Sequence, residues 1–206
     1  MTQLVATISL VVFVAVMLSV GVYSTKKAGT IEGFLLGGRN IGPWITAFAY
    51  GTTYFSAVIF IGYAGMFGWN IGIGSIWIGI GNAMIGCLLA WIFLAKRTRR
   101  MTRTLDARTM PEFFAARYDS RRMKIYAAAI IFIFLVPYAA GVYKGLGTMF
   151  SAIFVGAEPT TCMLIVAILT AVYLVLGGYV ATAINDFIQG LIMIFGLTAM
   201  VLILVT

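Results

Sequence analysis

The residues best placed for chemistry form a short polar interruption, Tyr-Gly-Thr-Thr-Tyr-Phe-Ser at positions 50–56, in the middle of a long apolar block. A helix inside a membrane can unwind where a glycine is followed by hydroxyl residues, which frees backbone carbonyls. Carbonyl and hydroxyl oxygens are the hard ligands that small cations prefer. The alternative is a continuous helix in which the Thr and Ser hydroxyls bond to carbonyls of the preceding turn. The sequence leaves both readings open, and it makes 50–56 a candidate cation site.

Three further polar residues lie within apolar blocks. Lys144 could extend its amine to the membrane surface, but an ionisable residue at membrane depth is also a candidate functional group. Its amine could bind the carboxylate of a solute or carry a coupling proton. Asp186 and Gln189 stand one helical turn apart at the start of the last apolar block. The carboxylate could cap that helix through the helix dipole, or the two side chains could serve as an ion exit or gate.

Enzyme chemistry has little support in this composition. The chain contains no histidine, so the commonest general base and metal ligand is missing. Cys87 and Cys162 lie inside apolar blocks, where cysteine acts as a small packing residue. The sequence shows neither a paired acid–base constellation nor a metal-binding cluster. We therefore expect a protein that is not an enzyme and that holds no cofactor.

Apolar blocks long enough to cross a membrane dominate the chain. Hydrophobic residues make up 62% and charged residues 10%, and the mean hydropathy is +1.05. A spanning helix needs about 20 apolar residues, and backbone groups in lipid must be satisfied within the protein. The sequence therefore predicts one all-α transmembrane domain over residues 1–206. Its spans are expected at 4–23, 41–67 (interrupted at its centre), 73–94, 125–150, 160–176 and 186–206. A short turn is expected at 68–70, and a tight backbone turn at Gly177-Gly178.

The net charge of +8 is carried by two short segments. All but one of the 14 Lys and Arg residues fall within 24–40 and 95–124. Short basic loops mark the cytoplasmic side of a membrane. This topology places the N-terminus outside a bacterial-type inner (plasma) membrane, and it makes membrane lipid, rather than nucleic acid, the expected partner of the charge. The last block is still apolar at Thr206, which suggests a truncated chain.

Four segments, in order along the chain, resemble motifs of the sodium:solute symporter family, which includes carriers of proline, pantothenate, sialic acid and sugars. Phe34–Arg39, FLLGGR, is similar to the motif ahead of that family's second span. Thr109–Tyr118, TMPEFFAARY, is similar to its cytoplasmic helix and begins with capping-box spacing. Gly177-Gly178-Tyr179 and then Asn185–Gly190, NDFIQG, resemble its Gly-Gly and Thr-Asp-x-x-Gln signatures. Asn185 replaces the usual threonine.

This resemblance implies a particular fold and site. The family fold is the LeuT-type arrangement of two inverted five-helix repeats, here preceded by one extra N-terminal helix. The present chain would supply the extra helix and the first repeat, and it would need the missing second repeat. The resemblance implies sodium ligands at the backbone carbonyls of Thr52 and Phe55. It places Thr53, Tyr54 and Ser56 near the substrate, and Gly51 and Lys144 complete the predicted substrate site. It matches Asp186 to the acidic residue on the ion's cytoplasmic path, and Gln189 belongs to the same predicted exit or gate.

The function that the resemblance implies is sodium-coupled import of a small organic solute by alternating access, with sodium as the coupling ion. Two alternatives stay open. One is a symporter-like sensory or regulatory membrane module, since such domains can be fused to signalling domains. The other is a proton-coupled carrier that uses Lys144.

Overall fold

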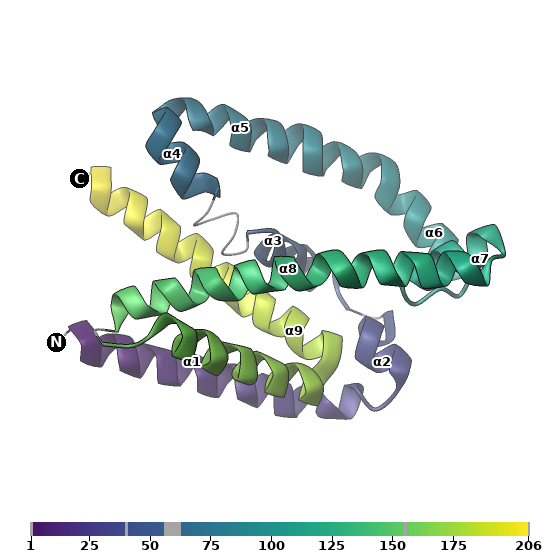
Figure 1. Ribbon diagram of the computed structural model, residues 1–206, viewed down its shortest axis with the longest axis horizontal. Helices are drawn as coiled ribbons and strands as arrows, with labels where there is room; N and C mark the ends of the chain where they lie inside the picture. Colours follow the sequence, from purple (N-terminus) through teal and green to yellow (C-terminus); the bar gives the residue numbers. More distant parts are fainter. Residues whose placement is uncertain (1, 40, 56–62, 155, 206) are drawn as a thin grey trace. The chain divides into compact units, whose positions relative to one another are not determined.

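The computed structural model describes residues 2–39, 41–55, 63–154 and 156–205. These residues are helical almost throughout and contain no strand (Figure 1). The chain divides into two compact units. Unit 1 comprises residues 1–57 and 142–206, and unit 2 comprises residues 58–141.

Unit 1 is built around its last helix, α9 (Pro159–Val205), which packs against α1 (Thr2–Ser24), α2 (Ile31–Leu36) and α3 (Pro43–Tyr54). The first of these, α1, is an apolar helix of 23 residues, long enough to cross the hydrocarbon core. The short helix α2 begins at Thr30, whose Oγ1 accepts a hydrogen bond from the amide of Gly33 at 3.0 Å. These contacts bring the two ends of the sequence into one helical bundle.

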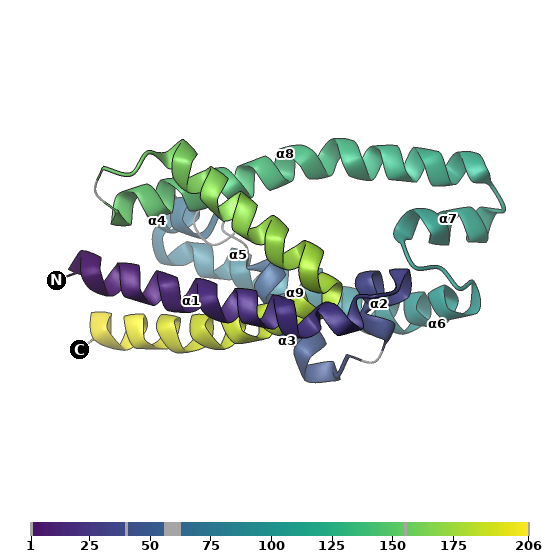
Figure 2. The ribbon, with the colours of Figure 1, turned by 90° about the horizontal axis from the view of Figure 1, so that it is seen from below.

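α9 is a continuous run of helical residues that changes direction sharply at Gly178, so it consists of two helical arms. Gly178 leaves the helical region with φ 55° and ψ −148°, a conformation that favours glycine. The two arms of α9 run back from this bend toward the same end of the unit (Figures 1 and 2). As a straight helix, the 46 residues from Pro159 to Leu204 would measure about 70 Å, over twice the roughly 30 Å hydrocarbon core. The bend therefore gives two membrane-length arms.

The position of the bend changes one expected boundary. The sequence suggested spans at 160–176 and 186–206 with a connection between them, but residues 177–185 are helical apart from Gly178. A Cβ atom at Gly178 would lie 2.8 Å from the backbone oxygen of Phe34 and 3.0 Å from its Cα. The reversal therefore takes a single residue, because a glycine there allows α2 to pack directly on the backbone of α9.

Small residues allow close packing where α1 crosses the first arm of α9. A Cβ at Gly21 would lie 3.2 Å from Tyr173 Cβ, and one at Gly177 would lie 2.9 Å from the Gly21 carbonyl and 3.1 Å from Ser24 Cβ. Ser24 and the nearby Ala181 are fully buried. Helices associate in lipid through such close contacts between small residues, since apolar surface alone gives no driving force there.

Unit 2 begins with a long helical segment, Tyr63–Thr104, which is apolar enough to cross a membrane. It contains α4 (Met66–Ile71), α5 (Ile76–Gly81), π-helical turns at Asn82–Leu88 and Trp91–Ala95, and α6 (Lys96–Thr104). The sequence predicted a turn at 68–70, but those residues lie in α4. The chain turns at Gly72 instead, with φ 68°, because glycine tolerates that conformation. Residues 56–62, which belong to the second half of the predicted span 41–67, lie outside the described residues.

The rest of unit 2 comprises α7 (Met110–Tyr118) and the first part of α8 (Arg121–Ile153), which continues into unit 1 and contains Pro137. Large apolar side chains along α5 and α8 are mostly exposed, among them Trp77 at 75% and Phe132 at 72%. In lipid, such side chains face hydrocarbon at no cost. The exposed apolar surface and the length of the helices define a multi-pass integral membrane protein.

Candidate functional site

The polar interruption at 50–56 coincides with the end of a helix. α3 has Pro43 in its first turn, where a missing amide breaks no hydrogen bond, and it ends at Tyr54. Phe55 leaves the helical conformation with φ −79° and ψ 45°, and its amide donates to the Gly51 carbonyl at 2.9 Å. The carbonyls of a last turn are the ones that a helix leaves without amide donors of its own. Ser56 lies outside the described residues.

The hydroxyl groups of this last turn contact the second arm of α9. Thr52 Oγ1 donates to the backbone carbonyl of Asp186 at 2.9 Å, and the Thr53 hydroxyl lies near the Asp186 carboxylate. Earlier in α3, Thr46 instead donates to the carbonyl of Gly42 at 3.0 Å, four residues back. The alternative of hydroxyls bonded to the preceding turn therefore holds at Thr46 and does not hold at Thr52.

A glycine on α9 allows this contact. A Cβ at Gly190 would lie 2.8 Å from Thr52 Oγ1 and 2.7 Å from Phe48 Cδ1. The rings of Phe48 and Phe187 pack edge to face beside it, with centroids 4.9 Å apart. Phe48 gave no functional signal in the sequence, since an aromatic residue in an apolar block has no distinguishing pattern. Together these residues hold the end of α3 against α9.

Asp186 lies inside a helix and not at its beginning. It stands about two turns beyond the bend at Gly178, so its carboxylate does not cap the N-terminus of the arm. Its side chain is half-buried. The phenol of Tyr173, from the first arm, lies within electrostatic range of the carboxylate. The sequence did not single out Tyr173, because nothing in a linear pattern shows that the two arms fold back on each other.

The other predicted site residues are placed elsewhere in unit 1. Gln189 Nε2 contacts Met17 Sδ of α1 at 3.6 Å, so this side chain points to α1 and not to α3. Lys144 lies on the exposed surface of α8, and within the described residues no contact joins it to Thr52 or Asp186. Asn185, next to Asp186, is 1% exposed, and its amide atoms have no hydrogen-bond partner in the described part of the chain.

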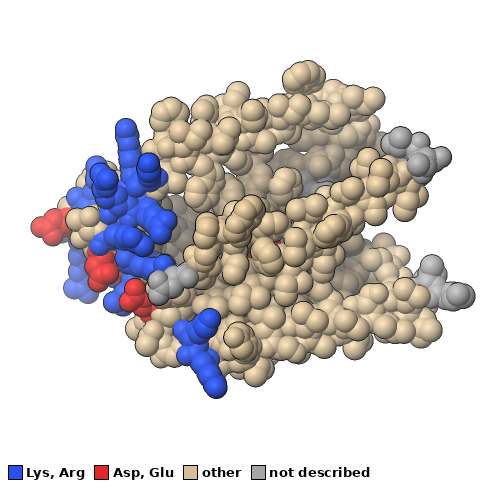
Figure 3. All heavy atoms as spheres, turned by 180° about the vertical axis from the view of Figure 1, so that it is seen from behind, with Lys and Arg blue, Asp and Glu red and all other residues tan. Residues whose placement is uncertain are grey.

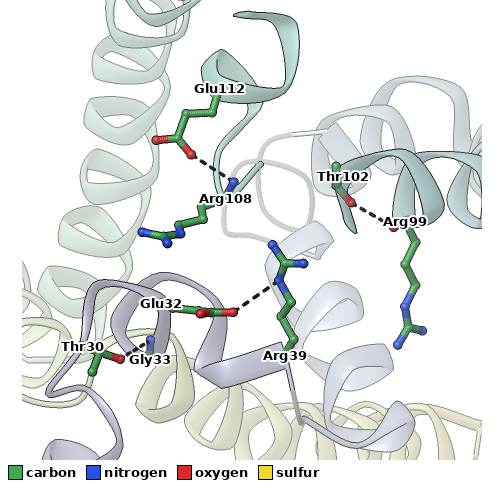
Figure 4. A network of polar contacts seen from close by, with 8 residues as sticks. All are labelled: Thr30, Glu32, Gly33, Arg39, Arg99, Thr102, Arg108 and Glu112. Carbon is green, nitrogen blue, oxygen red and sulfur yellow. Dashed lines mark hydrogen bonds and ion pairs between the residues drawn. The ribbon is translucent and has the colours of Figure 1, made fainter. Parts of the chain in front are cut away.

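The segment FLLGGR forms the end of α2 and the turn that leads to α3. Gly37, Gly38 and Arg39 all have positive φ, at 59°, 66° and 57°, and Arg39 pairs with Glu32 at 3.6 Å (Figure 4). A Cβ at Gly37 would meet the side chains of Ile41 and Val180 at 2.7 and 3.0 Å. The turn borders a cavity of about 560 Å³ between it and the start of the second arm of α9. The motif is therefore a tight connection that holds the first turn of α3 near α9.

The segment TMPEFFAARY forms α7 in unit 2, as its capping spacing predicted. Thr109 Oγ1 accepts from the amide of Glu112 at 3.4 Å. Glu112 Oε2 accepts from the amide of Arg108 at 3.0 Å, as Figure 4 shows. The bond from Arg108, with help from Lys124 at 3.7 Å, lowers the pKa of Glu112 against the opposing effect of burial. Phe113 is buried. This helix ties the basic loop to a fixed local structure.

Basic side chains gather at one end of unit 2. They belong to α6, α7, the loop between them and the first turn of α8 (Figure 3). Ten Lys and Arg residues against three carboxylates in 95–124 follow directly on a long apolar helix. This is the charge distribution of a membrane protein at its interface with the headgroups.

The described residues contain apolar helices of spanning length, a bend between two membrane-length arms, and a helix end bonded to the backbone carbonyl of a residue with a half-buried carboxylate. These features define an all-α membrane protein with a polar site inside a helical bundle. The chain belongs to the sodium:solute symporter family, whose profile matches residues 34–206.

Curated relatives agree with this assignment. The chain is 34% identical over 190 residues to the osmoregulated proline transporter OpuE of Bacillus subtilis, covering 90% of this chain and 38% of that protein. It is 34% identical over 194 residues to the sodium/proline symporter 2 of Staphylococcus saprophyticus and 33% identical to the sodium/proline symporter of Staphylococcus aureus, covering 92% of this chain and 37% of each. The chain thus spans less than two fifths of their length. No solved structure matches it.

Proposed function

We propose that the chain forms part of a sodium-coupled transporter that imports a small organic solute by alternating access. The observation that carries the proposal is the end of α3 at Tyr54, where Thr52 bonds to the backbone of Asp186. Sodium binds the carbonyls of Thr52 and Phe55. The negative end of the α3 dipole adds to their attraction for a cation. Discontinuous helices of this kind build ion sites in secondary transporters.

The solute binds beside this helix end. Gly51, Thr53 and Tyr54 line its position on α3, together with Ser56, which lies outside the described residues. The relatives whose names state a substrate are proline carriers, which supports a small amino acid such as proline. Lys144, exposed and without a carboxylate partner among the described residues, is the group we assign to the solute carboxylate. No cofactor takes part, and sodium is the coupling ion.

Asp186 controls the route of the ion to the cytoplasm, and Gln189 belongs to the same gate through its contact with α1. The bond between Thr52 and Asp186 joins α3 to α9 in this conformation. Alternating access requires two conformations that bind the ligands differently. In the second conformation the bond opens, and sodium leaves along the carboxylate.

The proposed architecture is the LeuT type. α1 is the extra helix, and the remaining helices form the first five-helix repeat. The second repeat completes the ion site, in accord with the greater length of the relatives. The basic end of unit 2 faces the cytoplasm by the positive-inside rule, in a bacterial-type inner membrane. The start of α1 and the end of α9 lie at the same end of unit 1 (Figures 1 and 2), so both lie on one side of the membrane, which in this proposal is the outside.

The test is uptake of labelled proline and of a panel of amino acids, sugars and carboxylates by the intact gene product, with and without a sodium gradient. Thr52→Val keeps the side-chain shape and removes the hydroxyl that reaches Asp186. Thr46→Val removes a hydroxyl of the same helix that bonds to its own preceding turn, at the carbonyl of Gly42. We expect the Thr52 variant to weaken the sodium dependence about tenfold and the Thr46 variant to match the parent. Equal effects of the two variants would reject the site.

Proton coupling through Lys144 is the competing mechanism, and the exposed amine without a carboxylate partner in the described chain favours testing it. It predicts uptake driven by a pH gradient in the absence of sodium. Lys144→Met would abolish that uptake. Under sodium coupling, the same variant changes the preference for carboxylated solutes and leaves the sodium dependence intact.

A further inference from the structure

A small hollow lies between α6 and α7 in unit 2. Its volume is about 290 Å³. The residues that line it are Arg100, Met101, Thr104, Leu105, Ala116 and Arg117. Two guanidinium groups therefore flank a mostly apolar floor.

The two arginines carry charge that no carboxylate of the described residues neutralises. Arg100 and Arg117 are exposed, and neither forms an ion pair within the described residues. Arg117 Nη1 contacts Met101 Sδ at 3.1 Å, and a thioether is only a weak acceptor. The carboxylate of α7, Glu112, bonds instead to Lys124 and to the amide of Arg108. Both guanidinium groups thus keep donors for an anion.

The hollow lies at the depth of lipid headgroups. α6 forms the end of the helical segment Tyr63–Thr104, and Arg100 follows Ala95, the last apolar residue before the basic segment, by five positions. At 1.5 Å per residue this places it about 7.5 Å beyond the apolar segment. The headgroup region extends roughly 5–8 Å beyond the hydrocarbon core on each side. An anion that reaches this position from the membrane is a phospholipid headgroup.

We propose that the hollow between α6 and α7 is a binding site for one anionic phospholipid, with Arg100 and Arg117 donating to its phosphate and the apolar floor contacting its glycerol end. Guanidinium groups bind phosphate through paired, charge-assisted hydrogen bonds. Basic pockets between helices at the membrane surface bind lipid headgroups by the same chemistry. The site does not depend on the transported solute or on the coupling ion.

Native mass spectrometry of the intact gene product tests the proposal. The protein is loaded from vesicles of equal parts phosphatidylglycerol and phosphatidylcholine, then stripped in detergent. We expect one retained phosphatidylglycerol, and at least tenfold less retention in the double variant Arg100→Gln/Arg117→Gln. The matched control, Arg97→Gln/Arg122→Gln, removes the same charge from exposed residues of the same basic segment and should retain lipid like the parent. Circular dichroism verifies that both double variants keep the parent's helix content.

Each other outcome overturns the proposal. Equal loss of retained phosphatidylglycerol in the two double variants would show that the general positive charge of the segment attracts the lipid and that there is no specific site. Equal retention of phosphatidylcholine would show that the headgroup charge is not recognised. Displacement of the lipid by millimolar inorganic phosphate would identify a site for a free anion. If the glutamine variant loses its helix content, Arg100→Lys/Arg117→Lys replaces it, with Arg97→Lys/Arg122→Lys as its control. Lipid retention that stays at the parent's level in both lysine variants would reject paired recognition by the guanidinium groups.

Discussion

Replacing Gly190 with alanine tests whether the contact between α3 and α9 is as close as the structure places it. The added Cβ would lie 2.8 Å from Thr52 Oγ1 and 2.7 Å from Phe48 Cδ1. Ordinary contact begins at 3.4 Å, so α3 and α9 must separate by about 0.6 Å. Separation by this amount would stretch the 2.9 Å bond from Thr52 to Asp186 to about 3.5 Å, at the limit of a hydrogen bond.

Two costs follow from that separation. Overpacking a well-packed contact costs about 1–3 kcal/mol, and losing the hydrogen bond costs about 1 kcal/mol more. We therefore expect Gly190→Ala to lower the free energy of unfolding by about 2–4 kcal/mol. If the proposed site is correct, it also weakens sodium-dependent uptake.

Gly196→Ala is the matched control on the same arm, because a Cβ there meets nothing within 4 Å. Alanine favours a helix over glycine by about 1 kcal/mol, so this variant should be neutral or more stable. The assay is thermal unfolding in detergent, followed by tryptophan fluorescence, together with sodium titration of uptake. The reasoning is refuted if both variants unfold at the parent's temperature, or if Gly190→Ala keeps the parent's sodium response while losing stability.

Three further predictions concern other parts of the chain. Gly178→Ala forces a non-glycine residue to φ 55° against the backbone of α2, and we expect little folded protein in membranes, whereas Gly196→Ala expresses normally. Asn185→Leu replaces a buried amide that has no partner in the described residues. It should raise the thermal unfolding temperature, because an unpaired buried polar group costs about 1–3 kcal/mol. A lower unfolding temperature would show that the amide has a hydrogen-bond partner. Glu112 has a lowered pKa, so its contribution to stability is present above the ordinary pKa of 4.5 and is lost as the pH falls through the lower, folded-state pKa. Glu112→Gln should therefore remove that part of the pH dependence of unfolding. An unchanged pH profile of the unfolding free energy would contradict the assignment.

The sequence was sufficient for the properties that depend on local composition. Apolar blocks of about 20 residues can only be helices in lipid, and the described residues are helical accordingly. Thr109 and Glu112 predicted the start of α7 because a capping box acts within four residues. The four motifs placed the chain in its family, which the profile match over residues 34–206 confirms. The roles that the resemblance assigns to Thr52, Phe55 and Lys144 stay predictions.

Boundaries were less predictable, because a helix ends where its surroundings require it to. Gly68 and Asn70 looked like a turn but lie in α4, and the turn falls at Gly72. Gly177 and Gly178 were both predicted to form a tight turn, but of the two only Gly178 leaves the helical region of backbone angles. Packing against Phe34 made the difference, and no local pattern reports a neighbour more than 140 positions away.

The sequence by itself determined that this is a multi-spanning helical protein of the sodium:solute symporter family, since hydrophobic length, charge placement and motif order are local properties. Only the tertiary structure decided which polar groups meet. It joined Thr52 to Asp186 and turned Gln189 toward Met17. It also made Gly190 a contact point and not merely a small residue. These pairings follow from the bend at Gly178, because the direction in which one arm leaves it sets every contact that this arm makes with α1 and α3.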